Sequence, residues 1–143
     1  MSNKINRLDK ILECMDEINF VMDNNKLKVT QAIENKVFKA AIKMNIVRIA
    51  EQFNKLKDDN EFKLLENFQG EDLKGINAVR NYIAHDYDSV DDEIIENVIR
   101  DRLPKIRETI ENVKNSLALE EIKEEMSDTQ AQEKTQSQVR KNK

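Results

Sequence analysis

Apolar residues recur at helical spacing through most of residues 1–119. The first run covers about 5–22, and its apolar positions are three, four or seven residues apart: Ile5, Leu8, Leu12, Met15 and Met22. This spacing is typical of an amphipathic helix that buries one face. Asp23, Asn24 and Asn25 then interrupt the pattern. We therefore expect a first helix that ends near these three polar residues.

The second run, about 30–56, carries two apolar stripes rather than one. The first stripe is Ile33, Val37, Ala40, Met44 and Val47. The second stripe is Ile42, Ile46, Ile49 and Phe53. A helix that is apolar on two faces needs two packing partners. We expect one partner to be the core of the protein itself, and the other could be a second subunit.

Three more helical segments follow after a break at Asp58, Asp59 and Asn60. A short helix is expected at about 61–68, ending at Gly70, and a second pattern then reaches Ala84. The last long helix is marked by apolar residues at steps of three and four: Ile95, Ile99, Leu103, Ile106, Ile110, Val113 and Leu117. Pro104 lies inside this pattern and cannot donate a backbone hydrogen bond, so a kink or restart is expected near Arg102 and Leu103.

Composition agrees with an all-α fold. The chain has two glycines and one proline, with 36% charged and 38% apolar residues. We predict an up-and-down bundle of about four or five helices for residues 1–119, a length that suits one domain. Residues 120–143 are rich in Glu, Gln, Lys, Ser and Thr. That segment has too few apolar residues to offset the entropy of ordering it, so we predict a disordered tail.

Charge and the rare residue types exclude several classes of function. The net charge of −4 argues against DNA binding through a broad basic surface. The single cysteine, Cys14, fits the apolar pattern of the first helix and is expected to be a buried thiol. No metal-ligand spacing and no Gly-rich phosphate loop is present, so we expect neither metal nor cofactor. With no signal peptide and no apolar run that could cross a bilayer, a cytoplasmic protein without membrane contact is expected.

One stretch combines residues that could carry chemistry: Arg80-Asn81-Tyr82-Ile83-Ala84-His85-Asp86-Tyr87. On a helix, Asn81 and His85 share a face, and Arg80 and Tyr87 lie on a neighbouring one. Val79 and Ile83 can then point into the core. The polar side chains are thus expected along one edge of the helix near its C-terminal end.

An arginine and a histidine are suited to metal-free cleavage of RNA. The forked guanidinium of Arg80 can bind phosphate oxygens, and an imidazole such as that of His85 can exchange protons near neutral pH. Cleavage requires removal of the proton from the ribose 2′-hydroxyl and stabilisation of a negatively charged transition state. Two copies related by a two-fold axis would double this small set and could form a cleft for the phosphodiester.

Simpler interpretations of the same residues stay open. His85 could hydrogen-bond the last carbonyls of its helix and interact with the helix dipole. Arg80 could form a surface ion pair of little energetic value. Tyr87 could be a residue at the edge of the core with its hydroxyl in water.

The stretch RNYIAHDY resembles the RxxxxHxY signature of HEPN-domain toxins, in particular the HepT-like group. The downstream segment ENVIRDRLPKIRETIENV is similar to the closing helix of that group, including its Leu-Pro. The order of the long helix, the break and the motif helix also matches. The resemblance covers the chain up to the polar tail, and it is specific because motif, context and helix order agree.

The resemblance implies a homodimeric helical bundle that acts as a metal-independent ribonuclease toxin. Arg80 and His85 would be the catalytic pair, Asn81 would help to position them, and RNA would be the substrate. The partner would be a minimal nucleotidyltransferase antitoxin that transfers AMP to Tyr87 and so blocks the cleft. Two other functions stay open: a non-catalytic binding subunit of a nucleotidyltransferase complex, and a helical adaptor in which the motif only caps a helix.

Overall fold

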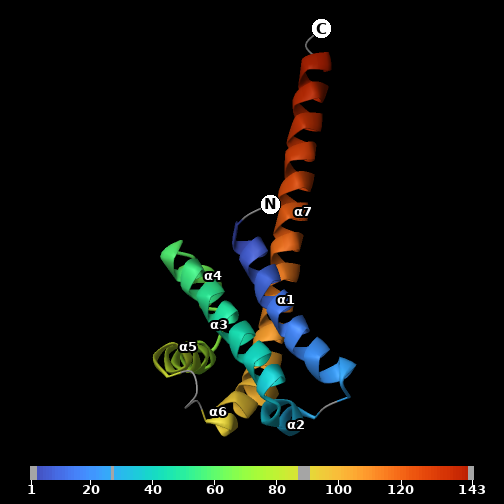
Figure 1. Cartoon of the computed structure of the whole chain (residues 1–143). Helices are drawn as coiled ribbons and strands as arrows, with labels where there is room; N and C mark the ends of the chain where they lie inside the picture. The colour runs from blue at the N-terminus through green and yellow to red at the C-terminus, as the bar shows by residue number, and fades with distance from the viewer. Residues whose placement is uncertain (1–2, 27, 87–90, 142–143) are drawn as a thin grey trace. The chain divides into compact units, whose positions relative to one another are not determined.

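The computed structural model describes the backbone of residues 3–26, 28–86 and 91–141, and the side chains of these ranges up to residue 129. Throughout these ranges the regular elements are helices, which confirms the all-α prediction (Figure 1). The chain divides into two units, residues 1–110 and 111–143. Tyr87, which the sequence singles out as the AMP acceptor, lies outside the described residues.

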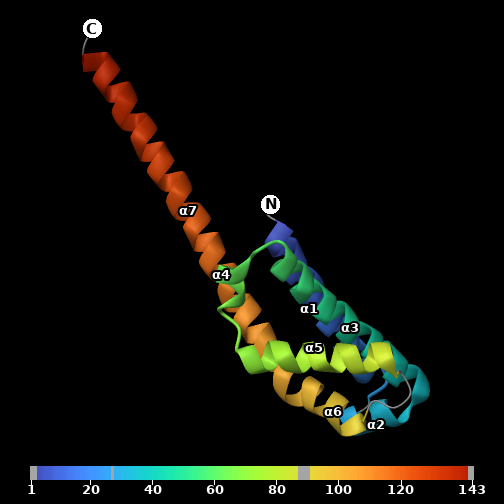
Figure 2. The same ribbon diagram turned by 90° about the vertical axis from the view of Figure 1, so that its left-hand side faces the viewer.

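Two long helices, α1 (Asn3–Asn24) and α3 (Lys36–Asp58), form the centre of the first unit. They lie side by side and run in opposite directions (Figures 1 and 2). Helix α5 (Gly70–His85) packs against α3, and the short α4 (Phe62–Leu65) connects the two. The largest fully buried side chains include Leu8, Ile11, Ile18, Ile42, Ile46, Ile49, Leu56 and Ile76. Burial of these aliphatic groups is the main force that holds the helices together.

The expected helix over 30–56 is two helices, α2 (Val29–Glu34) and α3, separated at Asn35. The side chain of Asn35 accepts hydrogen bonds from the backbone N–H groups of Val37 and Phe38, at 3.0 and 3.1 Å. An asparagine in this position satisfies two donors that a new helix would otherwise leave free. The apolar spacing continues across the break, so periodicity alone did not reveal it. The bundle therefore contains one more helix in this region than the sequence predicted.

The two apolar stripes of α3 have different surroundings. Ile42, Ile46 and Ile49 are fully buried, which confirms the expected contact with the core. On the other stripe, Val37 is 73% exposed and Met44 is 57% exposed. Ile33, at the start of this stripe, is buried in α2, so only its part in α3, around Val37 and Met44, is left exposed in the first unit.

An irregular turn precedes Pro104, as its missing N–H predicted. Helix α6 (Asp92–Asn97) continues into a π-helical turn, η2 (Val98–Arg102), in which the N–H of Leu103 donates to the carbonyl of Val98. Such a turn adds one residue to the helical repeat and rotates the side chains within it. Helix α7 (Leu103–Lys141) starts after it, and Leu103, Ile106 and Ile110 are buried in the first unit.

In the second unit α7 continues to Lys141, and residues 120–129 are all exposed. A domain boundary near residue 119 and disorder of residues 120–143 in solution stay predictions. None of the described helices is long and apolar enough to cross a membrane.

Candidate functional site

Helix α5 carries the candidate site, and its buried residues set its orientation. Ile76, Val79 and Ile83 are buried at steps of three and four, as expected for the face that packs on α3. Val79 and Ile83 therefore point into the core, as the sequence predicted. The other residues in the last two turns of α5 lie outside this contact: Arg80 is half-buried, and Asn81, Tyr82, Ala84 and His85 are exposed.

The candidate residues are among those outside the contact with α3. Asn81 and His85 are exposed and Arg80 is half-buried. Nη1 of Arg80 donates a hydrogen bond to Oδ1 of Asn81 at 3.2 Å. His85 is the last residue of α5, and Asp86 ends the helix with an N–H that donates to the carbonyl of Tyr82. The structure thus joins Arg80 to Asn81 and leaves His85 exposed one helical turn after Asn81.

The simpler interpretations of Arg80 and His85 can be compared with this geometry. Within the described ranges Arg80 forms no ion pair, and its guanidinium donates to the neutral amide of Asn81. His85 does lie in the last turn, where the helix dipole favours a positive charge. The imidazole belongs to an exposed residue.

The start of α5 is anchored by a contact that the sequence analysis did not identify. Nη1 of Arg102, from η2, donates to the carbonyl of Glu71 at 2.8 Å and to Oδ1 of Asp72 at 3.3 Å. The Asp72 side chain is only 7% exposed, so Arg102 neutralises a carboxylate that is nearly removed from water. This contact fixes α5 against the π-helical turn.

Gly75 makes room for the same guanidinium. A Cβ at this position would lie 2.6 Å from Cζ of Arg102, far inside van der Waals contact. A glycine in the middle of a helix costs stability, and the close approach of Arg102 is the reason for it here. An isolated glycine inside a helical pattern was the one sequence signal that could have pointed to this contact.

The arrangement at the end of α5 suits phosphate chemistry without a metal. It offers a guanidinium that makes one side-chain hydrogen bond among the described residues, an amide, and the imidazole of an exposed residue. No group of three or more metal-binding side chains occurs among the described residues. The groups that are present can bind an anion and exchange a proton.

Comparison with known families gives one match. The model of the family described as "Ribonuclease HepT-like" matches residues 1–113, which include every helix of the first unit and the candidate site. Searches of curated proteins and of solved structures return no match. Because the family model covers most of the chain, the chain belongs to the HepT-like ribonuclease family.

Proposed function

We propose that this protein is a ribonuclease toxin that cleaves RNA with Arg80 and His85. The observation that carries the proposal is the Arg80–Asn81 hydrogen bond near the end of α5, with His85 exposed one helical turn after Asn81. Membership of a ribonuclease family supports it, since a toxin ribonuclease is what the family implies. The polar edge supplies both the cation and the proton-transfer group that such a reaction requires.

In the proposed reaction His85 removes the proton from the ribose 2′-hydroxyl. The 2′-oxygen then bonds to phosphorus, and the bond between phosphorus and the 5′-oxygen breaks. Arg80 binds the non-bridging oxygens as negative charge develops on them, which lowers the barrier. The departing 5′-oxygen needs a proton, and in a dimer the imidazole of the second copy can donate it. Asn81 holds the Arg80 guanidinium through their hydrogen bond.

A homodimer is part of the proposal. The exposed stripe of α3, with Val37 and Met44, is an apolar surface without a large partner inside the first unit, and a second copy would remove it from water. We infer a shared cleft to which each copy contributes one Arg80 and one His85. Under this proposal a single copy carries an incomplete active site.

The proposed regulation is covalent. A minimal nucleotidyltransferase antitoxin, the type of partner that the family implies, would transfer AMP to Tyr87. Tyr87 is two residues after His85 in the chain, so the added phosphate would compete with RNA for the same cations. Incubation with the partner and ATP should add the mass of AMP to the wild type and not to Tyr87→Phe. Modification of Tyr87→Phe to the same extent would contradict this assignment.

Mixing two inactive variants tests the shared cleft. Arg80→Ala and His85→Ala should each abolish RNA cleavage and growth arrest when expressed without a partner. Refolding the two variants together should restore part of the cleavage, because a mixed dimer contains one intact copy of each group. If each variant cleaves RNA as the wild type does, the residue assignment is wrong. If folded wild-type dimers leave growth and RNA intact, a non-catalytic binding subunit is the better description.

A further inference from the structure

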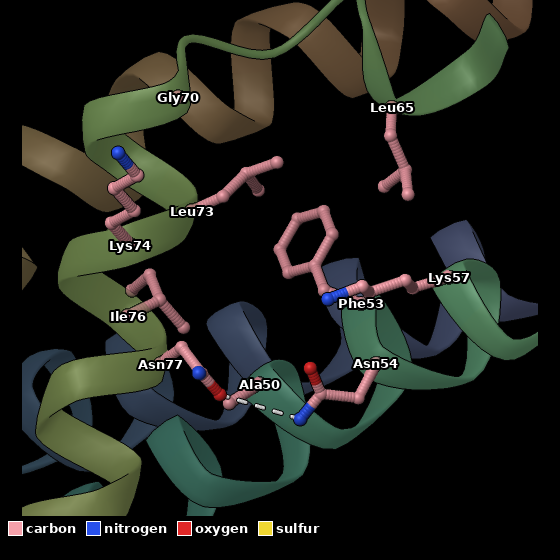
Figure 3. A pocket seen from close by; sticks show the side chains of 10 residues that line it. All are labelled: Ala50, Phe53, Asn54, Lys57, Leu65, Gly70, Leu73, Lys74, Ile76 and Asn77. Atoms are coloured by element: carbon pink, nitrogen blue, oxygen red, sulfur yellow. Dashed lines mark hydrogen bonds between the residues drawn. The ribbon is translucent and has the colours of Figure 1, made fainter. Parts of the chain in front are cut away.

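A cavity of about 300 Å³ lies between the C-terminal half of α3 and the first two turns of α5 (Figure 3). This volume is at the lower end of the range found for small-molecule sites. Leu65, from α4, closes one side of the cavity. The cavity is separate from the edge that carries Arg80 and His85, although both are built on α5.

The floor of the cavity is apolar and contains an aromatic ring. In Figure 3 the ring of Phe53 lies between the side chains of Leu73 and Leu65. The ring packs edge-to-face with that of Phe68, with ring centroids 5.2 Å apart and an interplanar angle of 78°. Phe53 is only 7% exposed, so its ring presents a small, fixed apolar surface to the cavity, against which part of a flat group such as a nucleobase can rest.

The rim of the cavity is polar and carries only positive charge. Lys57 extends from α3 toward the Phe53 ring, and Lys74 lies along α5 (Figure 3). Neither ammonium forms an ion pair with the described residues, and none of the lining residues is acidic. In a chain with 28 acidic and 24 basic residues, this local excess of unpaired cations is distinctive. It favours a negatively charged ligand.

Two amides complete the rim. Nδ2 of Asn54 donates to Oδ1 of Asn77 at 3.4 Å, a long hydrogen bond that leaves the remaining donors and acceptors of both amides available. Amides of this kind can hydrogen-bond the edges of an unpaired base. An aromatic floor, two amides and two cations together match a nucleotide.

The cavity lies on the same helix as the candidate active site. At 1.5 Å per residue, Lys74 precedes Arg80 by about 9 Å along α5. An RNA strand bound at Arg80 and extending toward the start of α5 would therefore reach Lys74 with its neighbouring nucleotides. We propose that this cavity binds one unpaired nucleotide of the substrate RNA, with its base over Phe53 and its phosphates at Lys57 and Lys74. This inference rests on the proposed ribonuclease function.

Salt-dependent binding of a labelled single-stranded oligoribonucleotide tests the cation pair. A probe of about 12 nucleotides is long enough for a site of this kind. His85→Ala serves as background so that the probe is not cleaved. Adding Lys57→Gln and Lys74→Gln should weaken binding and reduce the slope of log K against log salt by about 1.4, or about 0.7 for each lost phosphate contact. The matched control is Lys55→Gln with Lys63→Gln, which removes two exposed charges from α3 and α4 outside the cavity.

The base contact is tested on the RNA, so that the protein remains unchanged. A series of probes with one abasic ribose at each position in turn should contain a position where the His85→Ala protein binds about tenfold more weakly. That loss should be smaller in the variant that also lacks both lysines of the cavity. Equal binding and equal salt slopes for the cavity and control variants would overturn the inference, as would a series with no sensitive position.

The cleavage assay separates failure of this inference from failure of the proposed function. If cleavage by the wild type depends on Arg80 and His85 but not on Lys57 and Lys74, only the nucleotide site is wrong. If the folded wild type neither binds nor cleaves RNA, both the function and the site are overturned.

Discussion

The two ends of α5 each place an arginine beside polar groups, but with opposite consequences. At the start, the guanidinium of Arg102 donates to the carbonyl of Glu71 and to the carboxylate of Asp72. At the end, the guanidinium of Arg80 donates to the neutral amide of Asn81, and no ion pair is found for it within the described ranges. Arg102 has a buried charged partner, whereas Arg80, among the described residues, bonds a neutral amide on the surface.

This difference separates a structural role from a chemical one. A guanidinium that already neutralises a buried carboxylate cannot leave it without exposing an unpaired charge, so Arg102 stabilises the fold. A guanidinium whose partner is a neutral amide on the surface can bind a phosphate at no such cost. We therefore expect substitutions at the start of α5 to lower stability, and substitutions at its end to lower activity.

The largest effect is expected for Arg80→Ala and His85→Ala. Loss of the proton-transfer group or of the phosphate-binding cation should reduce the rate of RNA cleavage by roughly 10²–10⁴-fold. The midpoint of thermal unfolding should change little, since His85 is exposed and Arg80 has one neutral partner. A large drop in the midpoint with a proportionate loss of folded protein would instead assign these residues a structural role.

Arg102→Ala should give the reverse result. Removal of the guanidinium leaves the Asp72 carboxylate buried without this partner, which should lower the free energy of unfolding by about 2–3 kcal/mol. The loss can be measured by urea denaturation. Asp72→Asn removes the charge that needs a partner, so Arg102→Ala should cost less in an Asp72→Asn background. Equal costs in the two backgrounds would show that the ion pair does not stabilise α5.

Gly75→Ala should lower stability although alanine is the better helix former. The helical preference favours alanine by about 1 kcal/mol, but the new Cβ would displace Arg102 from Asp72, and we expect a net loss of about 1 kcal/mol. Gly70→Ala is the matched control, because a Cβ at Gly70 has no neighbour within 4 Å. Stabilisation by Gly75→Ala would mean that Arg102 finds another equally good position.

The smallest effect on stability is expected for removal of the C-terminal segment, whose described side chains are exposed and include no candidate site residue. Residues 120–129 are exposed, so ending the chain after Leu119 should change the free energy of unfolding by less than about 0.5 kcal/mol. Amide hydrogen exchange on the full chain should show little protection for residues 120–143 if the predicted disorder is correct. Strong protection there, or a larger loss on truncation, would contradict the proposed boundary.

The burial of Cys14 was predicted from the sequence and is confirmed by the structure. The sequence indicated a buried thiol from its place in an apolar stripe, and Cys14 is 1% exposed. Burial, as the largest cause, raises the pKa of this thiol above its usual value, with a smaller opposing influence of Arg48.

Helix positions and the buried stripe of α3 were predictable because they depend on local periodicity. The irregular turn before Pro104 was predictable for a local reason as well, since proline removes a donor from its own helix. The break at Asn35 was missed because the apolar spacing continues across it, although a helix-capping asparagine was visible in the sequence. Each of these features is decided within about one or two helical turns.

The sequence by itself determined the helical class, the stripe that enters the core, and the placement of Arg80, Asn81 and His85 in the last two turns of one helix. Tertiary structure decided which stripe of α3 is left exposed, which arginine is paired, and where the cations of the nucleotide-sized cavity meet. Asp72 and Arg102 are 30 residues apart, and Lys57 and Lys74 lie on different helices. Such pairs depend on how helices pack against one another, and spacing along one helix carries no information about that packing.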